Sequence, residues 1–252
     1  MGVITLTTDF GLDDPFVGMM KGVICRISPK AVIVDLTHQV PSFDIPVAAW
    51  MLKDSWRFFP EGSIHVAVVD PGVGSARKPI LVEWRGHRFV GPDNGIFSFF
   101  LDEGAVYHLT EPRYFLPEIE ATFHGRDIFA PVAAHLSTGI AAGEMGQLTT
   151  DAVRLDLTLP SEDGGRVRGE VVYLDKFGNA ITNLEMPRSA REIVMGSRAL
   201  PIVDCYSRCE RGEAAAVRGS TGRIEIFANR GNAAALLGIR RGDEVMVERD
   251  GE

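Results

Sequence analysis

The sequence predicts a two-domain protein, with an N-terminal α/β domain over residues 1–157, a linker over residues 158–166 and a smaller C-terminal β-barrel domain over residues 167–252. Strand and helix patterns alternate through the first domain, which indicates a mixed or parallel sheet with helices on both faces. Beyond a linker rich in Pro, Gly, Ser and charged residues, short strands alternate with turns, which is typical of a small barrel or sandwich.

The N-terminal elements are identified by their hydrophobic spacing. Apolar residues three and four apart mark the first helix, which we expect Asp13 or Asp14 to cap and Pro15 to enter in its first turn. The strand at 63–70 is largely apolar, as in a sheet covered on both faces. In order, we expect a strand at 2–9, a helix at 15–27, a strand at 31–38, a helix at 45–59, a strand at 63–70, a hairpin at 79–95, a short helix at 96–104 and a helix at 126–140.

The C-terminal elements are mainly short strands. Residues 233–238 form the one segment of this domain with a helical pattern. Turn signals separate the other segments, which supports the all-β assignment. The expected strands lie at 166–175, 179–185, 191–196, 199–206, 214–220, 223–229 and 243–251.

Composition excludes several classes of protein. A hydrophobic fraction of 45% and a charged fraction of 24% are ordinary for a soluble globular chain. The net charge of −8 (26 basic against 34 acidic residues) argues against a nucleic-acid or anionic-membrane surface, and no apolar run is long enough to cross a bilayer. An odd count of three cysteines and a start without a secretory apolar region favour a cytoplasmic location. Cys205 and Cys209 lack the further ligands of a zinc site.

Polar, glycine-containing turns follow several of these elements. Asp9, Asp70, Asp93 and His124 stand in four of them, and we expect them to converge because strand ends in an open α/β sheet share one edge. Each also has a structural interpretation, such as Asp9 capping a turn or Asp93 in an Asp-Asn-Gly turn, and Asp127 is expected to cap the following helix. A metal site built from the four is conceivable, but their spacing does not favour one. No phosphate-binding loop and no G-x-S-x-G elbow is found.

Six motifs occur in one order along the chain: TTDFG, VVDPGVGSAR, GPDNG, FHGRDIFAP, DKFGNAITN and NRGNAA. From Thr7 to Leu237 the chain closely resembles the S-adenosyl-L-methionine (SAM) hydroxide adenosyltransferase family, which is related to SAM-dependent fluorinases and chlorinases. The resemblance implies an N-terminal α/β domain, a C-terminal β-barrel and a homotrimer with active sites between subunits. It also implies the reaction SAM + water → adenosine + L-methionine, with SAM as a substrate and no cofactor.

The resemblance further implies roles for individual residues. The family's catalytic Asp–Arg–His set falls on Asp70, Arg77 and His124. Thr221 stands where the halogenases have an arginine, so their contact to the substrate carboxylate does not carry over. The substrate-binding positions fall on Asp9 at the ribose hydroxyls, Phe43 beside the substrate, Asp175 and Ser220 at the methionine end, and Phe177, Asn179, Asn232, Ala233 and Tyr206 around the adenine.

The expected chemistry is a displacement at the ribose C5′. The leaving methionine thioether is neutral and needs no general acid. A water held by Asp70 and His124, with Arg77 keeping Asp70 ionised, is therefore sufficient, and either Asp70 or His124 takes its proton. An ionised Asp70 opposes a halide by roughly 4 kcal/mol at about 4 Å, which favours water. The alternatives are a non-catalytic SAM or adenosine sensor, a metal-dependent hydrolase of nucleotides or phosphoesters, and a SAM-dependent halogenase.

Overall fold

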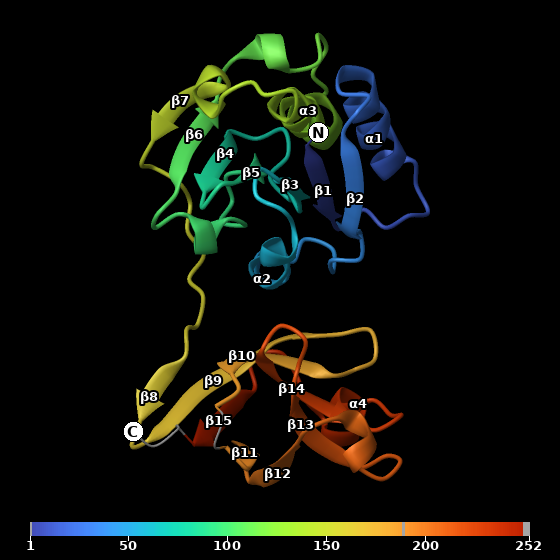
Figure 1. Cartoon of the computed structure of the whole chain (residues 1–252), viewed down its shortest axis with the longest axis vertical. Helices are drawn as coiled ribbons and strands as arrows, with labels where there is room; N and C mark the ends of the chain where they lie inside the picture. The colour runs from blue at the N-terminus through green and yellow to red at the C-terminus, as the bar shows by residue number, and fades with distance from the viewer. Residues whose placement is uncertain (1, 188–189, 249–252) are drawn as a thin grey trace. The chain divides into compact units, whose positions relative to one another are not determined.

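The computed structural model describes residues 2–187 and 190–248. The chain divides into two units, Met1–Asp156 and Leu157–Glu252, each built around its own sheet (Figure 1). In the described part of the chain, no helix is both long and apolar enough to cross a membrane.

A mixed sheet forms the centre of the N-terminal unit, with described strands in the order β2-β1-β3-β5-β4-β6-β7. The first four run parallel, and the last three join through antiparallel pairs. The mixed sheet expected from the sequence is confirmed. Its strands are β1 (Val3–Thr8), β2 (Val32–Thr37), β3 (Ile64–Val68), β4 (Pro79–Trp84), β5 (His87–Pro92), β6 (Ala105–Leu109) and β7 (Gly146–Thr149).

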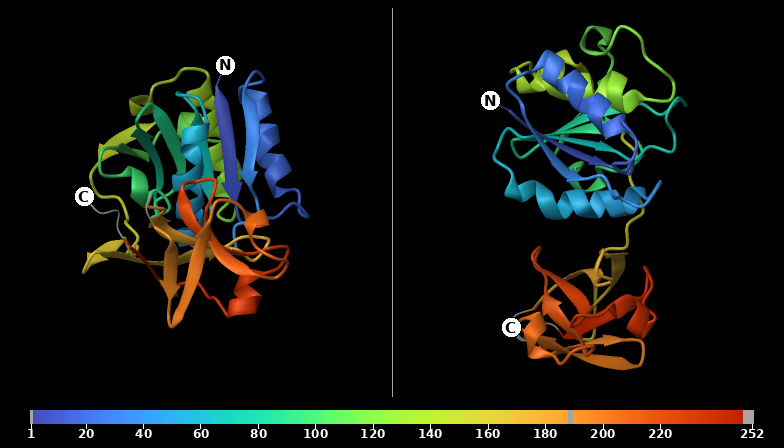
Figure 2. Two further views of the ribbon diagram at one scale, coloured as in Figure 1. Left: turned by 60° about the horizontal axis from the view of Figure 1, so that its bottom comes forward. Right: turned by 90° about the vertical axis from the view of Figure 1, so that its right-hand side faces the viewer.

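Helices cover both faces of this sheet (Figure 2). On one face, α1 (Phe16–Ile27) packs against α3 (Ala130–Ser137), and α2 (Ile45–Ser55) covers the other. Met20 of α1 and Val66 of β3 belong to one buried apolar cluster between helices and strands. Parallel strands need this cover on both sides, because their apolar side chains point to both faces.

The first helix and the short third one differ from the expected ones at their ends. Pro15, not Asp13 or Asp14, stands at the N-cap of α1, where its carbonyl accepts the Met19 N–H at 2.9 Å. At 96–104 the helix is a single 3-10 turn, Ser98–Phe100. A local periodicity therefore locates these helices but does not determine which residue starts them.

The helix expected at 126–140 begins as a π-helical turn, Gly125–Phe129, that continues into α3. Asp127 therefore lies inside the helix, and the expectation that it caps the start is wrong. Its carboxylate is fully buried, accepts the Glu120 N–H at 2.9 Å and pairs with Arg126 at 2.5 Å.

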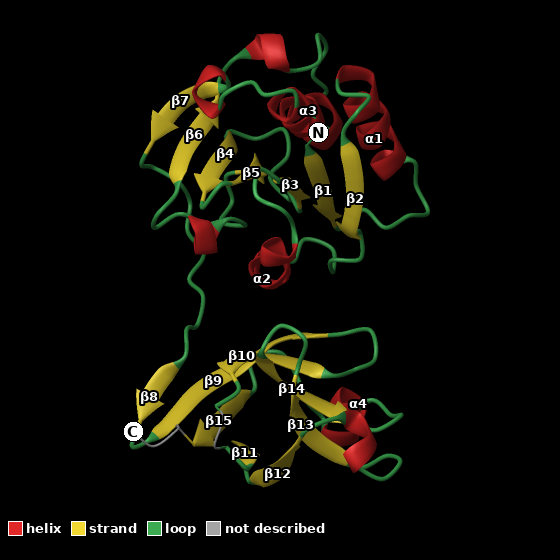
Figure 3. Cartoon of the chain, in the orientation of Figure 1, coloured by secondary structure: helices red, strands yellow, loops and turns green. Residues whose placement is uncertain are grey.

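Seven described strands of the C-terminal unit close into a barrel (Figure 3). Their order is β9-β10-β14-β13-β12-β11-β15, and β15 pairs with β9 to close the ring. Only β12 and β13 run parallel. The expected barrel is confirmed. Its elements are β9 (Arg166–Leu174), β10 (Ala180–Glu185), β11 (Glu192–Met195), β12 (Arg198–Val203), β13 (Ala214–Arg218), β14 (Arg223–Ala228), α4 (Ala233–Leu237) and β15 (Glu244–Glu248).

The segment 158–166, expected as a linker, contains a further strand. β8 (Ser161–Asp163) pairs antiparallel with β9. Gly164 and Gly165 turn between the two strands with φ of 57° and 82°, a conformation that favours glycine in two-residue hairpin turns. The strand expected at 243–251 is observed as β15, and its positions 249–251 lie outside the described residues.

Candidate active site

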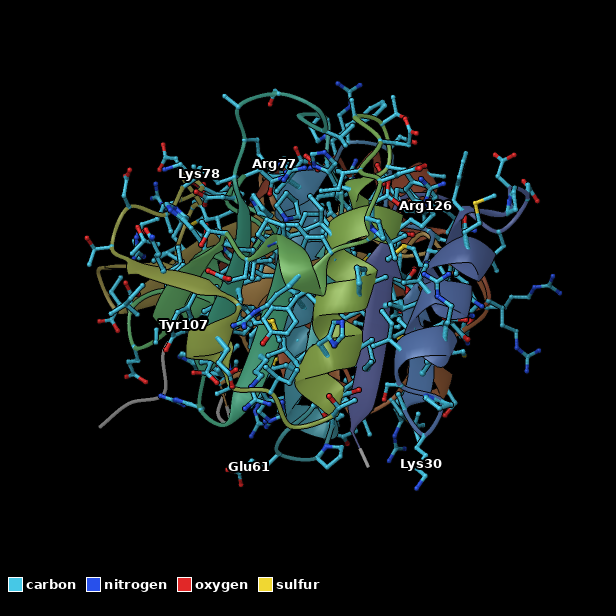
Figure 4. All side chains as sticks on the ribbon, turned by 90° about the horizontal axis from the view of Figure 1, so that it is seen from above. Lys30, Glu61, Arg77, Lys78, Tyr107 and Arg126 are labelled. Carbon is cyan, nitrogen blue, oxygen red and sulfur yellow. The ribbon has the colours of Figure 1, made fainter. Side chains whose placement is uncertain are left out.

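The ends of two neighbouring parallel strands open into a pocket of the N-terminal unit. Asp9 follows β1 directly, and Asp70 follows β3 by one intervening residue. The pocket has a volume of about 210 Å³, and its lining includes Asp9, Phe43, Asp70, Phe123 and His124. Loops that are distant in the sequence therefore meet at one edge of the sheet. Figure 4 shows Arg77 at this end of the unit, opposite Lys30 and Glu61.

Asp9 holds the loop that carries Phe43. Its Oδ2 accepts the Phe43 N–H at 2.9 Å. Phe43 has a left-handed backbone, with φ of 67°, which is unfavourable for a bulky side chain and needs support from its surroundings. The ring is 68% exposed at the edge of the pocket. Asp9 thus caps a loop and lines the pocket at the same time.

Arg77 joins Asp70 to His124. Its Nε donates to Asp70 Oδ1 at 3.2 Å, and its Nη2 donates both to Asp70 Oδ2 and to His124 Nδ1, the latter at 2.9 Å. The Arg77 and Asp70 side chains are only 7% and 4% exposed, and the guanidinium lies over the Phe129 ring. A buried, two-pronged ion pair holds both groups in one geometry.

The bond from Arg77 determines the proton position on His124. A guanidinium only donates hydrogen bonds, so Nδ1 accepts and the proton of the neutral ring is on Nε2. Burial and the charge of Arg77 lower the pKa of His124 below the usual 6.5, against the opposing charges of Asp70 and Asp127. His124 is therefore a neutral hydrogen-bond donor at pH 7.

Asp93 does not line the pocket, so three of the four polar residues expected to converge do so: Asp9, Asp70 and His124. Its Oδ1 accepts the Val153 N–H at 2.8 Å, and burial raises its pKa. The next residue, Asn94, donates from Nδ2 to the Val69 carbonyl at 2.8 Å and so supports the strand end before Asp70. Within the described residues, no group of three or more His, Cys, Asp or Glu side chains is placed to hold a metal ion.

A second pocket, of about 680 Å³, lies in the C-terminal unit. The turn between β9 and β10 and the segment after β14 contribute to it. Ala233 starts α4, is fully buried and is not part of the lining. The other residues that the resemblance assigns to this domain do line the pocket: Asp175, Phe177, Asn179, Tyr206, Ser220 and Asn232.

Hydrogen bonds within the turn before β10 restrict what its polar residues can offer a ligand. Asp175 Oδ1 accepts the N–H groups of Phe177 at 2.8 Å and Asn179 at 2.9 Å. Asn179 Nδ2 donates to Asp175 at 3.1 Å and to Glu225 at 2.9 Å, so only its carbonyl oxygen is left for a ligand. Asn232 offers a ligand a donor instead of an acceptor, because its Oδ1 accepts the Ala235 N–H at the start of α4 and its Nδ2 remains a donor.

Glu225 lines the same pocket, although no motif points to it. Its one sign in the sequence is a charge within the apolar run of β14. There Ile224 and Ile226 enter the barrel core, while Glu225 and Phe227 alternate to the other side. Glu225 is 7% exposed and accepts the Tyr206 hydroxyl at 2.7 Å. Burial raises the pKa of Glu225 and, together with the Glu225 carboxylate, raises that of Tyr206 to about 12.

Known proteins match both units. The family model described as SAM hydroxide adenosyltransferase N-terminal domain matches residues 4–146, and the corresponding C-terminal domain model matches residues 169–246. A crystal structure of an uncharacterized conserved protein from Thermotoga maritima has a TM-score of 0.90 and 32% identity, covering 99% of this chain and 100% of that one.

Curated relatives extend over nearly the whole chain. A Thermus thermophilus protein named (R)-S-adenosyl-L-methionine hydrolase is 37% identical over 98% of this chain and all of its own. A Methanocaldococcus jannaschii protein of the same name is 33% identical over 98% of this chain and 96% of its own length. A fluorinase of Nocardia brasiliensis is 23% identical over 98% of this chain and 96% of its own length. The chain therefore belongs to the SAM hydroxide adenosyltransferase family.

Proposed function

We propose that this protein hydrolyses SAM to adenosine and L-methionine by attack of water on the ribose C5′. The observation that carries the proposal is the hydrogen-bonded set Asp70, Arg77 and His124 at a pocket that Asp9 also lines. The names of the hydrolase relatives support the same reaction and specify the R configuration at the sulfonium, which we extend to the substrate of this chain.

Asp70 accepts the proton in this mechanism. His124 has Nδ1 occupied by Arg77 and a proton on Nε2, so it orients the water by donating to its oxygen. Arg77 occupies only part of the acceptor capacity of the Asp70 carboxylate, which has about four lone-pair sites. One hydrogen of the water can therefore point to Asp70 while an oxygen lone pair points to C5′.

The bond changes balance without another reactant. The C5′–O bond forms as the C5′–S bond breaks, the electron pair leaves on sulfur as a neutral thioether, and the water proton passes to Asp70. General-base assistance contributes roughly 10²–10⁴-fold, and holding the water in line with the C5′–S bond draws on the roughly 7–11 kcal/mol available from proximity and orientation. The reaction as written uses no metal and no organic cofactor.

The buried charge of Asp70 also selects the nucleophile. Its side chain is 4% exposed, so a halide beside it is poorly screened. At an effective dielectric constant of about 20, two unit charges about 4 Å apart repel by roughly 4 kcal/mol, which is an upper value here because the Arg77 cation offsets part of the Asp70 charge. Water carries no such penalty, which favours hydrolysis over halogenation.

The remaining pocket residues fit the rest of SAM. The carbonyl oxygen of Asn179 and the Nδ2 of Asn232 form an acceptor and a donor suited to a purine edge. The rings of Phe177 and Phe43 are 62% and 68% exposed and offer stacking surfaces. Asp9 offers a carboxylate to the two ribose hydroxyls, as acidic residues do in dinucleotide sites.

We also propose, from the family resemblance, a homotrimer in which each active site combines the N-terminal pocket of one subunit with the C-terminal pocket of a neighbour. Mixing Asp70→Ala protein with Asn179→Ala protein tests this. Mixed trimers would contain sites with both pockets intact and would regain activity, whereas sites within one chain would regain none. The cytoplasmic location stays a prediction from the cysteine content.

The first experiment incubates purified protein with SAM and a chelator and follows adenosine and methionine by liquid chromatography, beside an Asp70→Ala variant. We expect equimolar products from the wild type and a loss of at least about 10²-fold in the variant. Intact SAM together with measurable SAM binding would point to a sensor. Activity lost on chelation would point to a metal-dependent hydrolase, and 5′-chloro-5′-deoxyadenosine formed with added chloride would point to a halogenase.

A further inference from the structure

The turn that leads into α3 contains an ion pair between two consecutive residues. Arg126 donates to one carboxylate oxygen of Asp127 from Nε at 2.5 Å and to the other from Nη2 at 2.9 Å. Consecutive side chains of an α-helix do not face each other, and this pair lies instead in the π-helical turn Gly125–Phe129. Such turns frequently mark functional sites. The pair therefore belongs to the local geometry that directly follows His124 along the chain.

Asp127 binds the loop before His124 at three places. Its Oδ2 accepts the Glu120 N–H at 2.9 Å, and its backbone carbonyl accepts the Leu116 N–H at 2.9 Å. Its own N–H donates to the Phe123 carbonyl at 3.1 Å. Because Asp127 is fully buried, these bonds are shielded from competing water. The loop is thus fixed at its start, its middle and its end by one residue.

Arg126 holds the same loop through Phe123. The guanidinium lies over the Phe123 ring, with its carbon 5.1 Å from the ring centroid, in a cation–π arrangement. The ring lines the N-terminal pocket and packs edge-on against Phe10 and Phe16, at centroid distances of 6.0 and 5.4 Å. Arg126 therefore supports the ring that immediately precedes His124 at the pocket.

Two ion pairs contribute to the electrostatics of His124. Burial and Arg77 lower the pKa of His124, whereas Asp70 and Asp127 raise it. Further charged groups nearby are Asp9, which lines the same pocket as His124, and, beside Asp127 and Arg126, the side chains of Arg26, Glu118 and Glu120. The charge balance at His124 therefore depends on whether Asp127 is paired with Arg126.

We propose that Arg126 and Asp127 are positioning residues for SAM hydrolysis. Their ion pair holds the loop that ends in Phe123 and His124, so that the Nε2–H of His124 reaches the attacking water. Neither residue lines the pocket, and neither is among the residues to which the family resemblance assigns a role. The inference rests on the proposed function. A misplacement of about 1 Å from a change far from the chemistry costs about 10²-fold in rate, which is the scale of effect that loosening this loop would have.

The test compares the kcat–pH profile of SAM hydrolysis in wild type, Asp127→Asn and Arg126→Gln. Asparagine keeps the size of the side chain and can still accept the Glu120 N–H through its oxygen, but it carries no charge. Arg126→Gln removes the cation at a side chain that is 29% exposed and leaves the Asp127 charge unpaired. We expect kcat to fall roughly 10- to 100-fold in both variants and KM to rise less than about threefold.

The two variants should move the acidic limb of the profile, which reports the protonation of His124, in opposite directions. Without the Asp127 charge the pKa of His124 falls further, so the limb moves to lower pH. Without Arg126 the unpaired Asp127 charge raises the pKa of His124, so the limb moves to higher pH. A purely structural role would lower activity without opposite shifts. A limb that stays in place in either variant, or that moves in the same direction in both, would overturn the inference.

If Asp127→Asn does not fold, Arg126→Gln decides alone. A lower kcat with the limb at higher pH then supports the inference, and an unshifted limb overturns it. The matched control is the pair of Arg154 and Asp102, which lie 2.8 Å apart and are both exposed. Arg154→Gln and Asp102→Asn should change neither kcat nor KM nor the limb, since exposed ion pairs contribute little.

Failure of the proposed function is separable from failure of this inference. If the wild type binds SAM without hydrolysing it, the titration of His124 is followed by NMR from its ring C–H signal, identified among the six histidines by its absence in His124→Gln. Opposite shifts of this titration in Asp127→Asn and Arg126→Gln then still support the coupling of the ion pair to His124, and unchanged titrations overturn it. A wild type that hydrolyses SAM, with unshifted profiles in both variants, would overturn this inference alone.

Discussion

Replacing Arg77 by lysine separates the positioning of the catalytic groups from their charge. Arg77 makes three hydrogen bonds from two nitrogens, to both oxygens of Asp70 and to His124 Nδ1. A lysine ammonium keeps the charge but is a single point on a flexible stem and cannot form the planar fork. At least one charge-assisted bond is lost, which costs about 1.5–3 kcal/mol. If that energy is used in the transition state, SAM hydrolysis slows by roughly 10- to 150-fold.

The assay is steady-state SAM hydrolysis at neutral pH for wild type and Arg77→Lys. Because Arg77 lies behind Asp70 and His124 and is not part of the pocket lining, kcat should fall while KM changes little. The matched control is Arg85→Lys, which weakens an exposed pair with Glu103 and should change neither value, since exposed ion pairs contribute little.

Folding is checked separately by the fluorescence of the chain's three tryptophans, all of which precede residue 85 and so report on the N-terminal unit. An Arg77→Lys variant that retains activity within threefold would refute the positioning role. The same conclusion would follow if only KM rose, because Arg77 would then act on substrate binding.

Three further outcomes are expected. The kcat for SAM hydrolysis should fall as the pH drops through a value below 6.5, because protonated His124 can no longer accept the hydrogen bond from Arg77. A kcat–pH profile that is flat down to pH ~4 would contradict the assignment of the His124 proton to Nε2. His65 is buried, and burial and His87 lower its pKa to about 3. Between that pH and the unfolded value of 6.5, the imidazole is protonated in the unfolded chain but not in the folded protein. The contribution of neutral His65 to the free energy of unfolding is complete above pH 6.5 and decreases by about 1.4 kcal/mol per pH unit on acidification. His65→Leu should reduce this slope in urea titrations followed by tryptophan fluorescence. Gly74→Ala should lower kcat and thermal stability together, because Gly74 has φ of 77° and an added Cβ would lie 2.5 Å from the Ala121 carbonyl oxygen, in the loop before His124. Gly139 also has a positive φ, of 101°, but an added Cβ would meet open space, so the control Gly139→Ala should lower thermal stability and leave kcat unchanged.

The sequence identified the loops of the site better than the contacts within them. Alternating strand and helix patterns and the order of six motifs indicated the two-domain fold and the family. The ranking of polar side chains was less accurate. Asp93 looks as well placed as Asp70, since each follows a strand of the same sheet, yet Asp93 turns to Val153 and supports the chain after β7. A turn motif does not encode which distant backbone group its carboxylate will meet.

Glu225 was missed because periodicity places charged residues on the solvent side of a strand. In this barrel the side of β14 opposite the core faces the second pocket, and the charge is buried there beside Asn179 and Tyr206. The neighbours that bury it come from the turn before β10 and from the segment after β12, which no local pattern connects to β14.

The sequence by itself determined the strand and helix alternation of the first unit, the all-β character of the second, the family, and the candidates Asp70, Arg77 and His124. Only the tertiary structure decided that Arg77 contacts both partners at once, that His124 carries its proton on Nε2, and that Asn179 has a single acceptor left for a ligand. The physical reason is that backbone periodicity is local, whereas a side chain's partners and proton position depend on groups that loop packing brings within about 3 Å from elsewhere in the chain.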